Sequence, residues 1–297
     1  MNSVTDKGLV SPSNEPVVPN STPGSASVMP DVQGEPDRRN LAIHRVGVRG
    51  LRYPVLVEAN GQSQPSVAEF ELSVSLPAGQ KGTHMSRFVA LLEAMSKEGV
   101  CLSPASLKKL AKDMVVMLEA RDGTFHCTFP FFIRKAAPVS GVESLMDYKV
   151  SLSCDVLSGE LSRLAVCLKV PVKSLCPCSK EISDYGAHNQ RSEVTVEVFL
   201  DPAESSPSLE SLIRVVEAQA SCELWGLLKR PDEKYVTERA YDNAKFVEDL
   251  VRDVALAVRR VKGVNGFRVE AENFESIHNH SAFARVRWQR PSASVAV

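Results

Sequence analysis

Apolar and polar residues alternate along much of the chain from Leu41 onward, and this period of two predicts β-strands. The segment SVAEFELSVSL at 66–76 shows the alternation clearly. A strand of this kind turns one face toward a core and the other toward water. Strands are expected at 51–58, 66–76, 124–135, 147–157, 162–172, 192–200, 267–271 and 282–288.

Other segments carry their apolar residues at the spacing of an amphipathic helix, as in MSRFVALLEAM. Ser103 is suited to cap such a helix and Pro104 to begin it. Gly263 stands where the last helix needs a C-cap. Helices are expected at 85–95, from 103 to about 120, at 209–228 and from 242 to about 261.

The order strand, strand, helix, helix, strand, strand therefore occurs twice, in modules of about 41–158 and 159–297. We predict an α+β fold of two ββααββ modules, with antiparallel sheets that each carry a helix pair on one face. The length of 297 residues is enough for about two domains of ~150 residues each. The order of the elements alone assigns no function.

The first thirty residues differ from the rest in composition. Six of the 18 prolines lie before residue 37, and no aromatic residue occurs before Tyr53. Such a segment buries too little apolar surface to offset the entropy lost on ordering. We expect residues 1–30 to be a disordered extension, with a regulatory or partner-binding tail as the alternative.

Composition and charge narrow the class of protein. Apolar residues make up 43% and charged residues 24%, as in a globular protein, and the net charge is −1. A protein built to hold a nucleic-acid backbone usually has a basic excess, so no nucleic-acid partner is expected. No apolar run reaches the ~18 residues of a membrane span, and no secretory signal is recognisable at the start. We expect a cytoplasmic protein without membrane contact.

The chain has seven cysteines, an odd number that argues against a disulfide framework in this setting. Cys127, Cys154 and Cys167 lie in apolar or alternating segments and are interpreted as small buried hydrophobes. Cys176 and Cys178 lie instead in a segment rich in chemically active side chains.

That segment, 174–192, joins two expected strands and is too long for a hairpin turn. Cys176 and His188 are twelve residues apart, and a thiolate and an imidazole can share one divalent metal. No second Cys-x-x-Cys pair completes a structural zinc site, so an open, catalytic metal position is the more natural interpretation. A simple pair of thiols in a Pro-containing turn, Cys176 and Cys178, is the alternative.

A second cluster lies between the last two strands, where Glu275 and His278 can supply an oxygen and a nitrogen to one ion. His278 and His280 alternate in an extended chain and can share a face. A solvated turn could hold the same residues, but two of the six histidines fall here.

A third cluster, 82–87, opens the first expected helix, where backbone N–H groups attract anions and Arg87 adds a donor. The alternative is an N-cap at Thr83 with an ordinary exposed Arg87. His44 and His126 are interpreted as structural. Glu233 lies in a charged loop, where solvation is the default explanation.

Glu248 lies in the first turns of the last long helix. A carboxylate there can simply complement the helix dipole. It can also accept two N–H bonds from a heterocycle that carries adjacent ring and amino donors. Position alone does not decide between the two.

Together these segments resemble one family, the type IB GTP cyclohydrolases. The resemblance extends from about Met29 to near the C-terminus and rests on GTHMSRF (82–88), SLCPCSKEISDYGAHNQRS (174–192), SCELWGLLKRPDEKYVTERAYDNAKFVEDLVRD (221–253) and NFESIHNHSAFA (273–284). It implies a bimodular tunnelling fold, a homotetramer and a divalent metal, zinc or manganese. It also implies the conversion of GTP and water to 7,8-dihydroneopterin triphosphate and formate, the first step of folate and pterin biosynthesis.

The resemblance also implies roles for single residues. Metal-activated water is expected to attack guanine C8, and Glu248 to hold the guanine edge. Cys178 is given no role. The implied metal ligands are Cys176, His188, Glu233, Glu275 and His278, with Cys176 and His188 also catalytic; candidates for proton transfer or triphosphate binding are His84, Arg87, Lys180 and Arg191.

Three other interpretations compete with this one. A nitrile reductase of queuosine synthesis shares the fold and a cysteine, but it would not need the set of histidines and glutamates. An archaeal-type cyclohydrolase would stop at a cyclic phosphate. A non-catalytic metal- or pterin-binding protein would not need residues that activate water.

Overall fold

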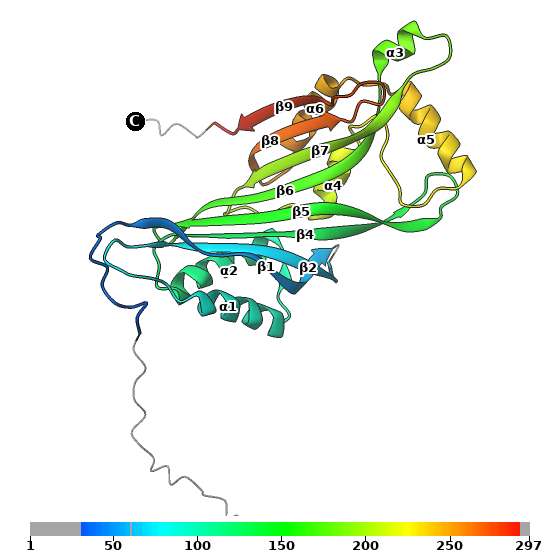
Figure 1. Ribbon diagram of the computed structural model, residues 1–297. Helices are drawn as coiled ribbons and strands as arrows, with labels where there is room; N and C mark the ends of the chain where they lie inside the picture. Colours follow the sequence, from blue (N-terminus) through cyan, green and yellow to red (C-terminus); the bar gives the residue numbers. More distant parts are fainter. Residues whose placement is uncertain (1–30, 60, 292–297) are drawn as a thin grey trace, which may run out of the picture. The chain divides into compact units, whose positions relative to one another are not determined.

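The computed structural model describes residues 31–59 and 61–291 (Figure 1). The disorder expected for residues 1–30 lies outside these ranges. The strands are β1 (Ile43–Ala59), β2 (Gln62–Leu76), β3 (Cys101–Leu102), β4 (Gly123–Ala136), β5 (Glu143–Leu157), β6 (Glu160–Leu175), β7 (Asn189–Leu200), β8 (Val264–Asn273) and β9 (Ala282–Gln289). The helices are α1 (Met85–Lys97), α2 (Pro104–Met117), α3 (Pro177–Ile182), α4 (Leu209–Glu217), α5 (Arg230–Asp242) and α6 (Val247–Arg259).

All strands belong to one nine-stranded sheet in the order β3-β1-β2-β4-β5-β6-β7-β8-β9. Every neighbouring pair is antiparallel except β1 and β3, which are parallel. The sequence pattern predicts separate sheets for the two halves, and this prediction is wrong. They are joined because Leu157 pairs with Glu160 across a two-residue turn, Ser158–Gly159, in which both residues have positive φ. Such a turn makes a tight hairpin between β5 and β6.

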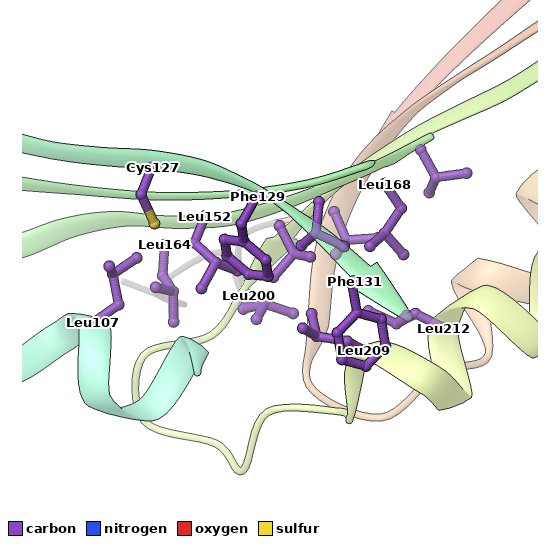
Figure 2. Close-up of a cluster of buried hydrophobic side chains, with 14 of the residues drawn as sticks. Leu107, Cys127, Phe129, Phe131, Leu152, Leu164, Leu168, Leu200, Leu209 and Leu212 are labelled. Carbon is purple, nitrogen blue, oxygen red and sulfur yellow. The ribbon is translucent and has the colours of Figure 1, made fainter. Parts of the chain in front are cut away.

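The helices of both halves pack on one face of this sheet, α1 and α2 on the first half and α4 and α6 on the second (Figure 1). Buried residues alternate with more exposed ones along β4 to β8, as the period of two predicts. Figure 2 shows side chains of the shared core, among them Phe129, Leu152 and Leu168 from the sheet and Leu209 from α4. No helix in the described ranges is long and apolar enough to cross a membrane.

The predicted start of α2 is confirmed. Ser103 Oγ accepts a hydrogen bond of 3.2 Å from the Ser106 backbone N–H, and Pro104 is the first helical residue. The predicted C-cap at Gly263 is wrong, because α6 ends at Arg259 with Arg260 as its C-cap, and Gly263 lies in the turn toward β8. Gly263 has φ +84°, and a Cβ there would lie 2.7 Å from the Ser205 carbonyl oxygen, so the turn requires glycine.

Two of the expected helices have other bounds, and two helices were missed, the short α3 within the segment 174–192 and α5. The helix expected at 209–228 ends at Glu217, and the one expected from residue 242 begins at Val247. Between them lies α5, which the sequence analysis took for a charged loop around Glu233. The amphipathic pattern of α5 is weak because one of its three buried residues is charged: these are Asp232, Val236 and Ala240.

The antiparallel order fixes which connections share an end of the sheet. Leu175 pairs with Asn189, and Asn273 pairs with Ala282, so the β6–β7 and β8–β9 connections lie at one end. The β2–α1 connection begins after Leu76, at the end where β4 starts and β5 finishes. The two ends are separated by the length of the strands. β6 has 16 residues and spans about 50 Å at ~3.3 Å per residue.

Candidate functional site

Cys176 and His188 lie next to each other where the β6–β7 connection leaves and re-enters the sheet. The Cys176 backbone N–H donates a 3.2 Å hydrogen bond to the His188 carbonyl oxygen, just beyond the pair Leu175 and Asn189. Cys176 is half-buried and is the N-cap residue of α3, which Pro177 begins. The sequence prediction that these two residues share a site is consistent with this geometry.

The connection between Cys176 and His188 is held by its own hydrogen bonds. Ser179 Oγ donates to the Cys176 carbonyl oxygen at 3.2 Å and accepts from the His188 backbone N–H at 3.1 Å. The tip of the connection, by contrast, exposes Ile182 and Tyr185 fully or nearly so. We call this connection, residues 177–187, the arm. Its base is held by hydrogen bonds, while its tip projects beyond the sheet (Figure 1).

Glu275 approaches His188 from the β8–β9 connection. Its Oε2 lies 4.0 Å from His188 Nδ1, and both side chains are only 13% exposed. Gln190 Oε1 lies 3.1 Å from the same ring nitrogen, and Ser276 Oγ lies 3.4 Å from it. Glu275 thus lies beside His188, whose backbone is bonded to that of Cys176, and we call these three residues the Cys176 corner (Cys176, His188 and Glu275).

A buried polar layer, which the sequence analysis missed, lies next to this corner in the sheet. Ser192 Oγ donates to Asn273 Oδ1 at 2.7 Å and lies 2.8 Å from Ser174 Oγ. All three side chains are buried. Ser174 precedes Cys176 by two residues, and Asn273 precedes Glu275 by two, so this layer fixes how the strands that carry the corner are aligned. Only the alternation of the strands hinted that these polar residues face inward.

His278 lies further along the β8–β9 connection and is exposed. Its ring stacks on His280 at a centroid distance of 5.0 Å, so these two side chains share a face as expected. Across residues 31–59 and 61–291, no three His, Cys, Asp or Glu side chains are grouped so as to hold a metal ion. One chain therefore brings together only part of the predicted ligand set, and the set stays a prediction.

Glu248 lies at the same end of the sheet as the Cys176 corner. The Lys245 backbone N–H donates a 3.1 Å hydrogen bond to the Leu175 carbonyl oxygen, which places the start of α6 beside the residue before Cys176. Glu248 follows in the first turn of α6 and is exposed. Its carboxylate is therefore accessible to a ligand at this end.

Glu233 lies in the first turn of α5 and is exposed, at some distance from the Cys176 corner. The other end of α5 contacts the arm, since Lys180 Nζ donates to the Tyr241 carbonyl oxygen at 2.6 Å. Eight residues separate Glu233 from Tyr241, or about 12 Å along the helix at ~1.5 Å per residue. Among the described residues, Glu233 belongs to no group of three possible metal ligands.

The residue beside it, Asp232, is buried and anchors α5. Its carboxylate accepts hydrogen bonds of 2.6–2.8 Å from the backbone N–H groups of Val139, Ser140 and Lys229 and from Ser140 Oγ. Burial raises the pKa of Asp232, but these hydrogen bonds outweigh it and hold the pKa below its ordinary value. The sequence analysis gave Asp232 no role, although it stands three residues after Lys229 at a helix start.

The two basic residues predicted near the corner have different surroundings. Lys180 Nζ, besides its bond to Tyr241, lies 4.2 Å from the centroid of the Tyr241 ring. Arg191 is exposed on β7, and its carbonyl oxygen accepts a hydrogen bond from the Phe274 backbone N–H. Both lie at the end of the sheet that carries Cys176, and their role toward a triphosphate stays a prediction.

His84 and Arg87 lie at the opposite end of the sheet. His84, and not Thr83, is the N-cap residue of α1, which follows β2. Arg87 Nη1 donates to the Met117 carbonyl oxygen and to a carboxylate oxygen of Glu119, both at 2.9 Å. In a single chain the third cluster therefore does not join the Cys176 corner.

The remaining cysteines and His126 have structural surroundings. All seven cysteines are free, and Cys127 and Cys154 are buried as predicted, while Cys167 is partly exposed. Burial raises the pKa of the Cys127 and Cys154 thiols to about 12. Burial also lowers the pKa of His126, whose Nε2 lies 3.3 Å from Thr128 Oγ1.

A hollow of about 510 Å³ lies on the sheet over β1, β2, β4 and β5. Arg52, Glu69 and Asp147 are among the residues that line it, and the predicted site residues are not.

Comparisons with known proteins follow the same segments. Residues 29–284 match the family model described as type I GTP cyclohydrolase folE2. The chain is 57% identical to GTP cyclohydrolase FolE2 of Bordetella pertussis over 268 residues, 90% of this chain and 99% of that protein. It is 57% identical to the protein of the same name from Cupriavidus necator over 259 residues, 87% of this chain and 94% of the relative.

The backbone also resembles solved structures with very different sequences. A crystal structure of uricase from Arthrobacter globiformis superimposes with a TM-score of 0.51 at 9% identity, covering 83% of this chain and 93% of that one. At such low identity the likeness concerns the fold alone. It shows that the nine-stranded sheet with helices on one face occurs in another group of proteins.

Proposed function

The chain belongs to the type I GTP cyclohydrolase FolE2 family, and from that membership we propose that it opens the imidazole ring of GTP at the Cys176 corner. Its activity is that of a GTP cyclohydrolase of folate biosynthesis. The products of the proposed reaction are 7,8-dihydroneopterin triphosphate and formate. The family does not fit the nitrile reductase or the non-catalytic binding protein considered above.

The single observation that supports the proposed site is that Cys176, His188 and Glu275 lie at the same end of the sheet, linked through His188. The His188 carbonyl oxygen accepts from the Cys176 N–H, and His188 Nδ1 lies 4.0 Å from Glu275 Oε2. These residues come from two connections that are far apart in the sequence. Nothing in the packing of the core requires a thiol, an imidazole and a carboxylate at this exposed end.

The donor chemistry of the corner fits a divalent metal. Sulfur and imidazole nitrogen favour zinc, and carboxylate oxygen suits manganese, so the set tolerates either ion. Cys176, His188 and Glu275 would hold it, with His278 and Glu233 as the further predicted ligands. A bound ion of this kind lowers the pKa of water, so that hydroxide forms near neutral pH.

His188 is prepared for its role by its neighbours. Gln190 Oε1 and Glu275 Oε2 both lie near Nδ1, at 3.1 and 4.0 Å, and an N–H at Nδ1 would donate to them. Nε2 is then the nitrogen left for a ligand bond or for taking up a proton. Gln190 is buried, so the orientation of the ring is fixed from the sheet side.

Glu248 is proposed to bind the guanine. Guanine presents a ring N–H and an amino group side by side, and one carboxylate can accept both hydrogen bonds. Because the start of α6 lies beside Leu175, a base held by Glu248 would lie near the Cys176 corner. Positioning of this kind supplies a large part of catalysis when C8 must meet a nucleophile.

We propose that two chains complete the site. His84 and Arg87 lie at the opposite end of the strands from Cys176, so they can reach the corner only from another copy of the chain. A homotetramer of bimodular tunnelling-fold subunits provides such contacts. The likeness of the backbone to uricase supports this fold assignment.

The proposal also includes the cellular compartment of the enzyme and the class of its partners. A thiolate ligand needs a reducing compartment, which favours the cytoplasm. The near-zero net charge gives no reason to expect a nucleic-acid partner.

A product assay tests this function. Purified protein is incubated with GTP and either manganese or zinc, and formate and oxidised, fluorescent neopterin are measured. Cys176→Ala should abolish both products, while the matched variant Cys178→Ala keeps them. Release of a cyclic phosphate in place of the triphosphate would indicate the archaeal-type reaction, and full turnover by Cys176→Ala would contradict the proposed site.

A further inference from the structure

A buried lysine lies at the end of β4, outside the residues proposed to bind metal or GTP. The side chain of Lys135 is only 1% exposed. Its Nζ donates to Glu217 Oε1 at 2.8 Å and to the Leu224 carbonyl oxygen at 2.7 Å, and it lies 2.5 Å from Glu223 Oε2. All three N–H bonds of the ammonium group thus have acceptors. A lysine is almost never buried to this extent without a partner.

The partners of Lys135 depend on its charge. Glu217, at the end of α4, is 3% exposed, and its Oε1 also accepts a 2.6 Å hydrogen bond from the Tyr148 hydroxyl. Glu217 Oε2 is buried without a hydrogen-bond partner among the residues described. Lys135 is therefore the cation that compensates this carboxylate, and its removal would leave a buried charge unpaired.

These contacts hold one particular segment, residues 218–229, which we call the α4–α5 connection. Glu223 and Leu224 belong to it, and Trp225 donates from Nε1 to the Ala136 carbonyl oxygen at 2.9 Å. Lys135 Nζ also lies 4.9 Å from the Trp225 ring centroid. The end of β4 thus contacts three consecutive residues of the α4–α5 connection, Glu223, Leu224 and Trp225.

The α4–α5 connection in turn holds the end of β6. Cys222 and Lys173 exchange two backbone hydrogen bonds, of 2.9 and 3.3 Å. Ser221 Oγ accepts a 3.3 Å hydrogen bond from the backbone N–H of Leu175, the residue before Cys176. A continuous series of contacts therefore runs from Lys135 through the connection to Leu175, the residue before Cys176.

The same connection also reaches the start of α6. Lys245 donates from Nζ to the Gln219 carbonyl oxygen at 2.8 Å and from its backbone N–H to Leu175 at 3.1 Å. Glu248 follows three residues later. The α4–α5 connection thus contacts both the end of β6, just before the proposed metal ligand Cys176, and the start of α6, which carries the proposed guanine-binding residue Glu248.

We propose that Lys135 is a positioning residue for this enzyme: it fixes the α4–α5 connection, which sets the position of Cys176 and of the start of α6. The inference rests on the proposed role of Cys176. Displacement of a reacting group by about 1 Å costs on the order of 10²-fold in rate. Lys135→Met should therefore lower kcat by about that factor.

Kinetics and hydrogen exchange together test the proposal. Lys135→Met removes the charge and keeps a similar length, and Lys135→Arg keeps the charge. Lys112→Met, which removes an exposed 3.1 Å ion pair with Glu160, is the control. In Lys135→Met, amide exchange should rise in peptides that cover 173–176 and 219–225, while β5 stays protected. Lys135→Arg should recover part of the loss of kcat, and Lys112→Met should behave as wild type.

Several results would overturn the proposal. Wild-type kcat and exchange in Lys135→Met would show that the contacts do not set the corner. An equal rise of exchange in every strand would make Lys135 a general stabiliser of the core. Should Lys135→Met not fold, Glu223→Gln is measured in its place. Glu223 is 34% exposed, and its variant should show the same local rise in exchange, whereas unchanged exchange at 173–176 would contradict the proposal.

The two measurements, kinetics and hydrogen exchange, separate this inference from the proposed role of Cys176. Hydrogen exchange is measured without metal or GTP, so it reports on the path from Lys135 to Cys176 alone. If Cys176→Ala turns over GTP normally, the proposed role of Cys176 fails, whatever the exchange pattern of Lys135→Met.

Discussion

His188 Nδ1 lies 4.0 Å from Glu275 Oε2, although the two residues come from connections on either side of β7 and β8. Both side chains are only 13% exposed. This contact joins the two clusters that the sequence analysis had identified separately. In the proposed site, Glu275 would either ligate the metal directly or orient His188 toward it.

Glu275→Gln tests this contact. The variant keeps the size of the side chain and removes the charge, so metal affinity and kcat should each fall by about 10–100-fold. Metal affinity is measured by competition with a chelator, and kcat at saturating metal. Glu272→Gln, a substitution on β8 three residues earlier, is the control. Wild-type metal affinity in Glu275→Gln would contradict a role of Glu275 at the metal.

Glu248→Gln tests the guanine contact. Loss of a bidentate pair costs ~1–3 kcal/mol, so kcat/KM for GTP should fall by about 10–100-fold, with the change mainly in KM. The neighbouring Asp249→Asn is the control. Asp249 accepts from the Phe246 N–H at the helix start, so its variant should lower the melting temperature and leave KM unchanged. An unchanged KM for GTP in Glu248→Gln would remove Glu248 from the site.

Asp232 makes stability depend on pH. Its folded pKa is below the unfolded value of about 3.9, so its contribution is complete above that value and is lost as pH falls through the folded pKa. Asp232→Asn should therefore be less stable than wild type at neutral pH, and the gap should narrow as the pH falls below about 4. The difference in stability is measured from the midpoints of urea unfolding at neutral pH and at a pH below about 4.

Glu233→Gln is the matched control for that experiment. Glu233 is the next residue and is exposed, so its variant should have the wild-type midpoint at both pH values. A gap for Asp232→Asn that has the same size at neutral and acid pH would show that the ionised carboxylate is not what anchors α5.

Mixing inactive variants tests the site between two chains. Cys176→Ala lacks the thiol of the corner and Arg87→Ala lacks the residue from the opposite end, so under the proposed homotetramer each variant alone should be nearly inactive. After unfolding together and refolding, about a quarter of the sites should hold an intact copy of each residue. Activity should return to about that fraction of wild type. No recovery in verified hybrid tetramers would show that one chain carries the whole site.

The strand pattern was predictable because each strand has one buried face, and the alternation of SVAEFELSVSL returns in β2. The joining of both halves into a single sheet was not predictable, because it depends on the positive φ of Ser158 and Gly159 in a two-residue turn. The helix α5 was missed because a carboxylate, Asp232, anchors it in place of an apolar residue. Its partners, Val139 and Ser140, are more than ninety residues away.

The candidate site was predictable where the residues lie in one motif and less so where the fold decides. Cys176 and His188 share a loop, so their proximity could be inferred. The placement of Arg87 at the opposite end depends on the direction of β2 in the sheet, which spacing does not show. The contacts of Lys135 with Glu217 and Leu224 join residues more than eighty positions apart, and no local pattern marks them.

The central claim is that the thiol of Cys176 binds the metal that the reaction uses, and cobalt titration tests it most directly. Protein freed of metal by a chelator is titrated with Co²⁺, and the thiolate-to-cobalt charge-transfer absorption is recorded. The band should appear in wild type and in Cys178→Ala and be absent in Cys176→Ala. A band of full intensity in Cys176→Ala, or one that disappears with Cys178, would contradict the account.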